Sequence, residues 1–175
     1  MDISLENEAI RIFSLKESHL SILLRLYNKF EEFKFATGFV EKVDFKDICR
    51  IYAEAVNDKH SFFAGICPKD GSRIIGLIKG AVRGAVKKVL WINTLLVDTD
   101  FQNKGYGTMS LNLILEYFYN AFGIQDIFVS VIKSNAKGLN FWVNKGFKEI
   151  KGLRIIKNFD NLCHNVLIMH KIYYP

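Results

Sequence analysis

The residue types with the clearest chemical potential lie in a short polar turn between an apolar run and a helical pattern. Residues 90–97 are mostly apolar and are typical of a buried strand. Gln102, Lys104, Gly105 and Gly107 follow, and apolar residues at helical spacing begin directly after them. The first N–H groups of a helix lack intrahelical partners and carry the positive end of the helix dipole. Glycine lets an anion approach such amides because it has no Cβ. The turn therefore predicts a phosphate-binding site.

The spacing of the two glycines excludes two well-known nucleotide loops. A Walker A loop has four residues between its glycines, followed by Lys and then Ser or Thr. Here one residue separates Gly105 from Gly107, and Thr108 follows directly. A dinucleotide-binding fingerprint needs a third Gly or Ala, and Ser110 stands at that position. A different class of phosphate loop is therefore expected.

The turn resembles the central motif of the GNAT superfamily, the acetyl-CoA-dependent N-acyltransferases. That motif is Val, four residues, Gln or Arg, two residues, Gly, one residue, and Gly or Ala. Val97, Gln102, Gly105 and Gly107 fill its four positions.

A second segment strengthens the resemblance. After a strand-like run at 127–131, the chain has Asn135, an aromatic residue seven positions later at Trp142, and then Gly146 and Phe147. This order is similar to the second GNAT motif, in which an Asn precedes a helix and Gly-Phe opens the next strand. Two motifs in the right order, with a helix and a strand between them, make coincidence improbable.

The resemblance implies one GNAT domain over residues 1–175, with a mixed α/β sheet of about seven strands, a splayed centre and four helices. The residue pattern predicts a strand at 10–15, a helix capped by Ser18 that reaches about residue 30, and an irregular segment at 31–42. A second helix is predicted to begin at the cap Asp44. Splaying would let an extended ligand chain hydrogen-bond to strand edges in the middle of the sheet.

The resemblance also implies where acetyl-CoA would bind. The strand edge at Leu95, Leu96 and Val97 is expected beside the pantetheine arm, where one amide would also polarise the thioester carbonyl. Asn135 matches the cofactor-contacting Asn across the splay, and it would serve equally as a helix N-cap. The Lys104 side chain is either solvent-facing or a phosphate contact. Backbone N–H groups are expected to cradle the pyrophosphate along Gln102, Asn103, Lys104, Gly105, Tyr106, Gly107 and Thr108.

Neither usual proton-transfer residue of the family is at its expected place. An attacking primary amine with a pKa of about 10.4 must first lose a proton, which requires desolvation or a base. The resemblance implies a Glu about six residues before the motif Val, where this chain has Trp91, and an acidic Tyr at Trp142. An indole cannot act as a proton acid. Two hypotheses follow: an N-acetyltransferase acting on a primary amine of a small molecule or a protein N-terminus, and a non-catalytic CoA-binding regulatory module.

Carboxylates and phenylalanines alternate between the first two predicted helices. Glu31, Glu32 and Glu41 would form an acidic, aromatic rim that suits a cationic amine. The alternative is that the phenylalanines are core and the glutamates are solvated. Glu31, Glu32 and, near the last hairpin, His164 are the candidate bases. No metal is expected, since the histidines and cysteines lack metal-ligand spacing.

Composition and charge limit the class of protein. Half of the 175 residues are hydrophobic and 24% are charged, which excludes a disordered chain. Residues 1–70 have a net charge of −2 and residues 71–175 a net charge of +8, so the basic half suits the phosphates of CoA. No nucleic-acid module and no membrane-spanning run is found, so neither partner is expected. Three scattered cysteines favour a cytoplasmic protein, and a homodimer would suit the family.

Overall fold

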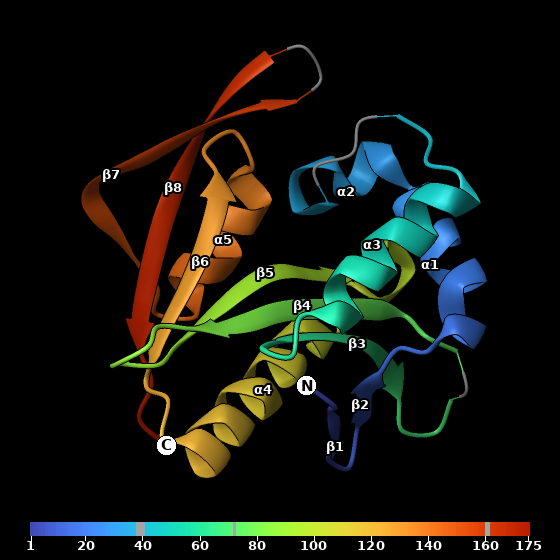
Figure 1. Ribbon diagram of the computed structural model, residues 1–175, viewed down its shortest axis with the longest axis horizontal. Helices are drawn as coiled ribbons and strands as arrows, with labels where there is room; N and C mark the ends of the chain where they lie inside the picture. The colour runs from blue at the N-terminus through green and yellow to red at the C-terminus, as the bar shows by residue number, and fades with distance from the viewer. Residues whose placement is uncertain (38–40, 72, 160–161) are drawn as a thin grey trace.

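The protein is built on one mixed sheet of eight strands in the order β1-β2-β3-β4-β5-β6-β8-β7 (Figure 1). The computed structural model describes residues 1–37, 41–71, 73–159 and 162–175, and the side chains of 30–32, 151–159 and 162–164 lie outside that description. The strands are β1 (Ser4–Glu6), β2 (Ile10–Ser14), β3 (Ser61–Pro68), β4 (Gly76–Arg83), β5 (Val89–Val97), β6 (Asp126–Ile132), β7 (Lys148–Phe159) and β8 (Leu162–Ile172).

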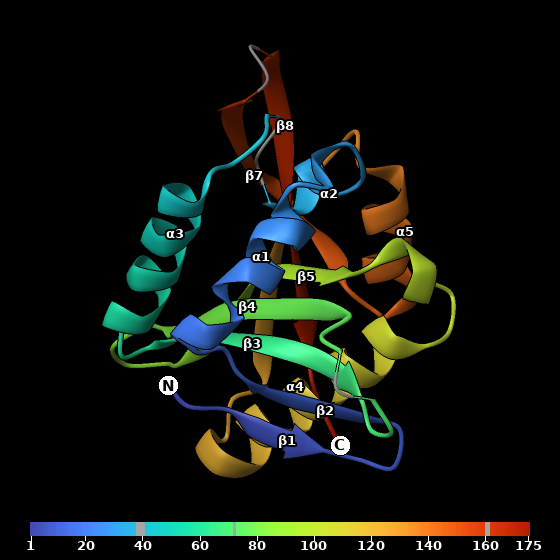
Figure 2. The same ribbon diagram turned by 90° about the vertical axis from the view of Figure 1, so that its right-hand side faces the viewer.

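Helices cover both faces of this sheet, as the turned view shows (Figure 2). One face carries α1 (Leu20–Tyr27), α2 (Phe30–Thr37) and α3 (Phe45–Asn57), which bury apolar side chains such as Leu23 and Ile48. The other carries α4 (Tyr106–Phe122) and α5 (Ala136–Asn144), with Ile114 and Phe118 fully buried. Within the described ranges, no helix is long and apolar enough to cross a membrane.

The sheet opens between β5 and β6, as the resemblance predicted. These two strands are parallel neighbours and pair only from Leu90 to Ile92 on β5. Beyond that point β5 continues to Val97 and β6 to Ile132 with no pairing between them. An interior strand directs alternate N–H and C=O groups to each neighbour. The open stretch of β5 therefore presents backbone groups to the space between the strands.

The predicted mixed α/β sheet is confirmed, with small differences in the number of its elements. The sheet has eight strands rather than about seven, and the part of the chain described has five α-helices rather than four. The additional helix is α2, which lies in the segment predicted to be irregular. Tertiary contacts stabilise it, because Phe33 is buried and Thr94 on β5 donates to the carbonyl of Ala36 at 3.3 Å.

The two predicted helix caps had different outcomes. Ser18 is not a cap, since it lies inside a short 3₁₀ turn (Glu17–His19) and α1 begins at Leu20. Asp44 does cap α3, and its carboxylate accepts the backbone N–H of Asp47 at 2.8 Å.

Candidate active site

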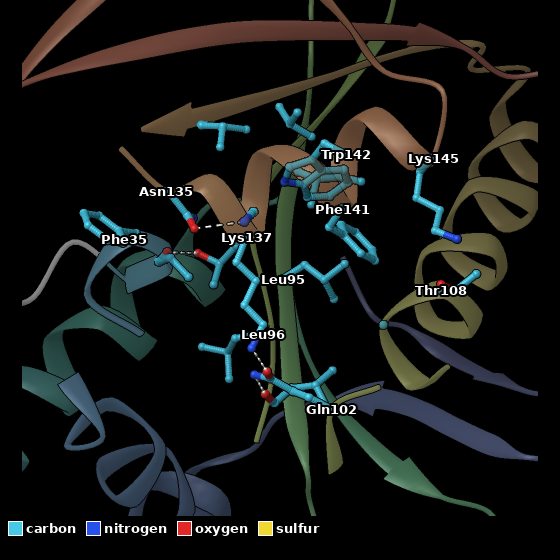
Figure 3. Close-up of a pocket in the computed structure, with 18 of the residues that line it drawn as sticks. Phe35, Leu95, Leu96, Gln102, Thr108, Asn135, Lys137, Phe141, Trp142 and Lys145 are labelled. Atoms are coloured by element: carbon cyan, nitrogen blue, oxygen red, sulfur yellow. Dashed lines mark hydrogen bonds between the residues drawn. The ribbon is translucent and has the colours of Figure 1, made fainter. Parts of the chain in front are cut away.

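A cavity of about 420 Å³ lies where β5 and β6 separate (Figure 3). Its walls come from the open edges of both strands, from the turn before α4, from the start of α5 and from α2. Ten of the eleven predicted cofactor residues line it: Leu95, Leu96, Val97, Gln102, Asn103, Gly105, Tyr106, Gly107, Thr108 and Asn135. The predicted residues therefore meet around one space, although they come from three separate elements.

The exception is Lys104, whose side chain turns away from this cavity. Its ammonium donates to the carbonyl of Asp100 at 3.0 Å and lies 5.4 Å from the ring centre of Phe101. Lys104 is not among the residues that line the cavity. The Lys104 side chain is therefore solvent-exposed in this structure, and a phosphate contact stays a prediction.

The N-terminus of α4 supplies backbone amides to the cavity. Gly105 caps this helix with φ of 83° and ψ of −7°, a left-handed conformation that glycine adopts without strain. The N–H groups of Tyr106, Gly107 and Thr108 lie in the first turn, where no intrahelical carbonyl is available. A Cβ added to Gly107 would lie 3.5 Å from Phe141 and 3.9 Å from Val97. Glycine at 107 therefore keeps the space between those two side chains open.

Gln102 makes hydrogen bonds with its backbone N–H and with both ends of its side-chain amide. Its backbone N–H donates to the carbonyl of Thr99 at 3.1 Å, so the cradle of free amides begins after it. Its side-chain nitrogen donates to the carbonyl of Val97 at 2.7 Å. Its side-chain oxygen accepts from the ammonium of Lys137. Gln102 thus joins the end of β5 to the start of α5 across the opening.

Asn135 is the N-cap of α5, one of the two roles considered for it. Its side-chain oxygen accepts the backbone N–H of Gly138 at 2.9 Å. A Cβ at Gly138 would lie 2.4 Å from the Asn135 amide nitrogen, so glycine makes room for the cap. The first turns of α4 and α5 contain no acidic side chain. Both helix starts lie at the cavity, and no acidic side chain in these turns offsets the positive ends of the two helix dipoles.

The two tryptophans at the usual proton-transfer places have unlike surroundings. Trp142 is buried in the cavity wall and meets Phe141 and Phe147 edge-on, with ring centres 5.0 and 4.9 Å apart. Trp91 does not line the cavity, and its ring stacks on Phe128 at 5.1 Å. Asn93 lines the cavity instead, next to an irregularity in the pairing of β4 with β5. The position of Trp91 was predicted by spacing from Val97 alone. A β-bulge between these positions changes which residues face the cavity.

The α2 side of the cavity is aromatic. Phe33, Phe35 and Ala36 line it, whereas Glu41 is exposed and does not. The side chains of Glu31, Glu32 and His164 lie outside the described residues, so an acidic rim stays a prediction. Among the described lining residues the charged side chains are two lysines, Lys137 and Lys145. In the same part of the chain, no three His, Cys, Asp or Glu side chains converge to hold a metal.

A buried carboxylate connects the α2 side to the end of β5. The Asp98 side chain is 0% exposed, and it accepts from Lys29, just before α2, at 2.7 Å and from Arg73 at 3.4 Å. Burial raises the pKa of Asp98, but the hydrogen bond and charge of Lys29, with the charge of Arg73, outweigh burial and hold the pKa below its ordinary value. The ion pair therefore fixes the base of α2 beside the turn that leads to α4.

Comparison with known proteins identifies the family. The model of the acetyltransferase (GNAT) family matches residues 22–147, which is more than half of the chain. This protein is a GNAT acetyltransferase. The matched range includes the turn before α4 and the segment around α5, which carry the two stretches that resemble the GNAT motifs. A search of curated proteins found no match.

Solved GNAT structures share the fold at low sequence identity. Spermidine N-acetyltransferase from Vibrio cholerae, in complex with CoA and spermine, has 17% identity and a TM-score of 0.78, covering 95% of this chain and 96% of that one. The Salmonella typhimurium enzyme that modifies the N-terminal serine of a ribosomal subunit protein has 13% identity and a TM-score of 0.83, covering 98% and 100%. The microcin C7 self-immunity acetyltransferase MccE, with acetyl-CoA and AMP, has 17% identity and a TM-score of 0.79, covering 95% and 94%.

Proposed function

We propose that this GNAT protein transfers an acetyl group from acetyl-CoA to a primary amine by direct attack of the amine on the thioester. One observation carries this proposal: the cavity combines an open strand edge with the N-termini of two helices. An elongated ligand with amides along its arm and phosphates at one end needs that combination. Acetyl-CoA supplies the activated acetyl group as a thioester.

The residues present fit each part of the donor. Amides of Tyr106, Gly107 and Thr108 would hold the pyrophosphate, since unpaired N–H groups at a helix start favour anions. The open edge of β5 from Leu95 to Val97 would hold the pantetheine arm, and one of its N–H groups would stabilise negative charge on the thioester oxygen. These contacts use backbone atoms, so they do not depend on the missing acid and base side chains.

The aromatic wall offers a physical route to a neutral amine. Phe33 and Phe35 present apolar surface to the α2 side of the cavity. Desolvation of a protonated amine there lowers its pKa, which eases loss of the proton to water or to a carboxylate. A thiol with a pKa of about 8.5 can leave as the thiolate, so an acid at Trp142 is dispensable.

The test is acetyl transfer to a panel of amines. Purified protein is incubated with acetyl-CoA and, separately, a polyamine, a peptide with a free N-terminal serine and an arylalkylamine. Free thiol and acetylated product are measured, the latter by mass spectrometry. Product with at least one amine, above the rate without protein, is the expected result. Tight CoA binding without product from any amine in a wider panel would support the non-catalytic module instead.

A further inference from the structure

Lys137 stands at an unfavourable place for a cation unless an anion joins it. It is the second residue of α5, where the helix dipole is positive, and no acidic side chain lies in the same turn. Its side chain is exposed to solvent yet does not extend outward. It runs from α5 past Leu95 to Gln102 and lines the cavity (Figure 3).

The contact that Lys137 makes has a defined direction. The Val97 carbonyl can only accept and the Lys137 ammonium can only donate, so the Gln102 amide must place its nitrogen at Val97 and its oxygen at Lys137. The ammonium thus lies against the turn whose amides face the cavity. Gln102 lies in that turn, four residues before the first of those amides. Its neutral oxygen is a weaker acceptor for an ammonium than a phosphate oxygen.

We propose that Lys137 is a clamp for the pyrophosphate of acetyl-CoA, closing over it from α5 while the first turn of α4 holds it from the other side. The Gln102 oxygen and a phosphate oxygen are alternative acceptors for the same ammonium. Exchange between them needs only rotation of the Lys137 side chain, because both acceptors lie at the same turn. The proposal rests on the proposed function and assigns a phosphate contact to a residue that is not among those specified by either GNAT motif.

Two lysine variants test the clamp. Lys137→Met removes the ammonium and keeps the aliphatic stem. Lys133→Met is the matched control, since Lys133 is an exposed lysine just before α5 that does not line the cavity. Binding of CoA and of dephospho-CoA, which retains the pyrophosphate but lacks the ribose phosphate, is measured by titration calorimetry. Binding of pantetheine, which lacks both phosphates, is followed by the shift in melting temperature at millimolar concentration.

The clamp predicts one pattern across these ligands. Lys137→Met should weaken CoA and dephospho-CoA by the same factor, about tenfold at low salt and less at high salt. Pantetheine should stabilise this variant and the wild type alike, and Lys133→Met should leave every value near the wild type.

Three outcomes would overturn the clamp. Loss of affinity for CoA but not for dephospho-CoA would place Lys137 at the ribose phosphate. An equal loss for pantetheine would show a structural role, and tighter binding of all three ligands would show that Lys137 only obstructs the cavity. Absence of CoA binding by the wild-type protein would instead refute the proposed function, so the two failures are distinct.

Discussion

The two sides of the cavity are built in different ways. The side formed by β5, α4 and α5 presents backbone amides and the ends of two helices, and its glycines leave space for a ligand. The side formed by α2 presents side chains, mainly phenylalanines. Backbone groups can recognise the same ligand in proteins of very different sequence. Side chains change with each substitution, so the second side is where GNAT proteins with different acceptors can differ.

A charge placed among the amides should have the largest effect. Gly107→Glu directs a carboxylate between Phe141 and Val97, where the proposed pyrophosphate would lie. Repulsion between like charges and loss of space should weaken CoA binding at least about 100-fold. Position 107 has no positive φ, so the backbone is not strained by this change. Calorimetric titration with CoA gives the affinity.

Gly107→Ala is the matched control for that variant. Its methyl group would meet ordinary contact distances, so CoA affinity should stay within about threefold of the wild type. Both variants should unfold at the wild-type urea midpoint. If Gly107→Glu bound CoA normally, the backbone side would not be the cofactor side.

Removing the ion pair that joins the two sides should have the next largest effect, a loss of folding stability. Asp98→Ala leaves Lys29 and Arg73 without their buried partner, and should lower the free energy of unfolding by about 2 kcal/mol at pH 7. Because the folded-state pKa of Asp98 is depressed, the ionised carboxylate stabilises the fold above its unfolded pKa of about 4. That contribution is lost as the pH falls through the folded-state pKa.

Urea denaturation at several pH values measures this difference. The gap between wild type and Asp98→Ala should shrink as the pH falls below about 4. Asp100→Ala, at an exposed aspartate two residues away, is the control and should change stability by less than about 0.5 kcal/mol. A gap that stayed constant with pH would mean that packing, rather than charge, makes Asp98 important.

Replacing a phenylalanine on the α2 side with alanine should change the KM of the acceptor amine and not that of acetyl-CoA. Phe35→Ala removes apolar surface from the cavity and should raise the KM of the best amine about five- to tenfold. The KM of acetyl-CoA should be unchanged. Steady-state kinetics with each substrate varied in turn separates the two values. Equal increases in both would show that α2 does not belong to a separate acceptor side.

The smallest effect, on kcat, is expected at Trp142, the position at which the family usually has its acid. Trp142→Tyr installs the phenol that the resemblance led us to expect, within a wall of Phe141 and Phe147. If the thiolate leaves without help, kcat should stay within about threefold of the wild type. The pH profile of kcat is the measurement. A rise above tenfold, with a new alkaline limb, would show that protonation of the leaving group limits turnover.

Much of the cofactor side was predictable from the sequence. The glycine turn, the strand before it and Asn135 are local features, and each depends on backbone geometry that a few neighbouring residues set. Lys137 was missed because a lysine in a first helical turn is ordinary, although its position two residues after Asn135 was visible. The bulge that brings Asn93 to the cavity could not be predicted from local sequence, because pairing with β4 determines it.

The family and the glycine turn followed from the sequence alone, and so did the tryptophans at the two usual proton-transfer places. These follow from residue types at fixed spacing along one stretch of chain. Three other features depend on tertiary packing: the helical conformation of α2, the bridge from Val97 through Gln102 to Lys137, and the burial of Asp98 beside Lys29. The Gln102–Lys137 contact crosses the opening, and Asp98 pairs with a residue that is distant in the chain, so packing rather than local spacing sets which side chains meet.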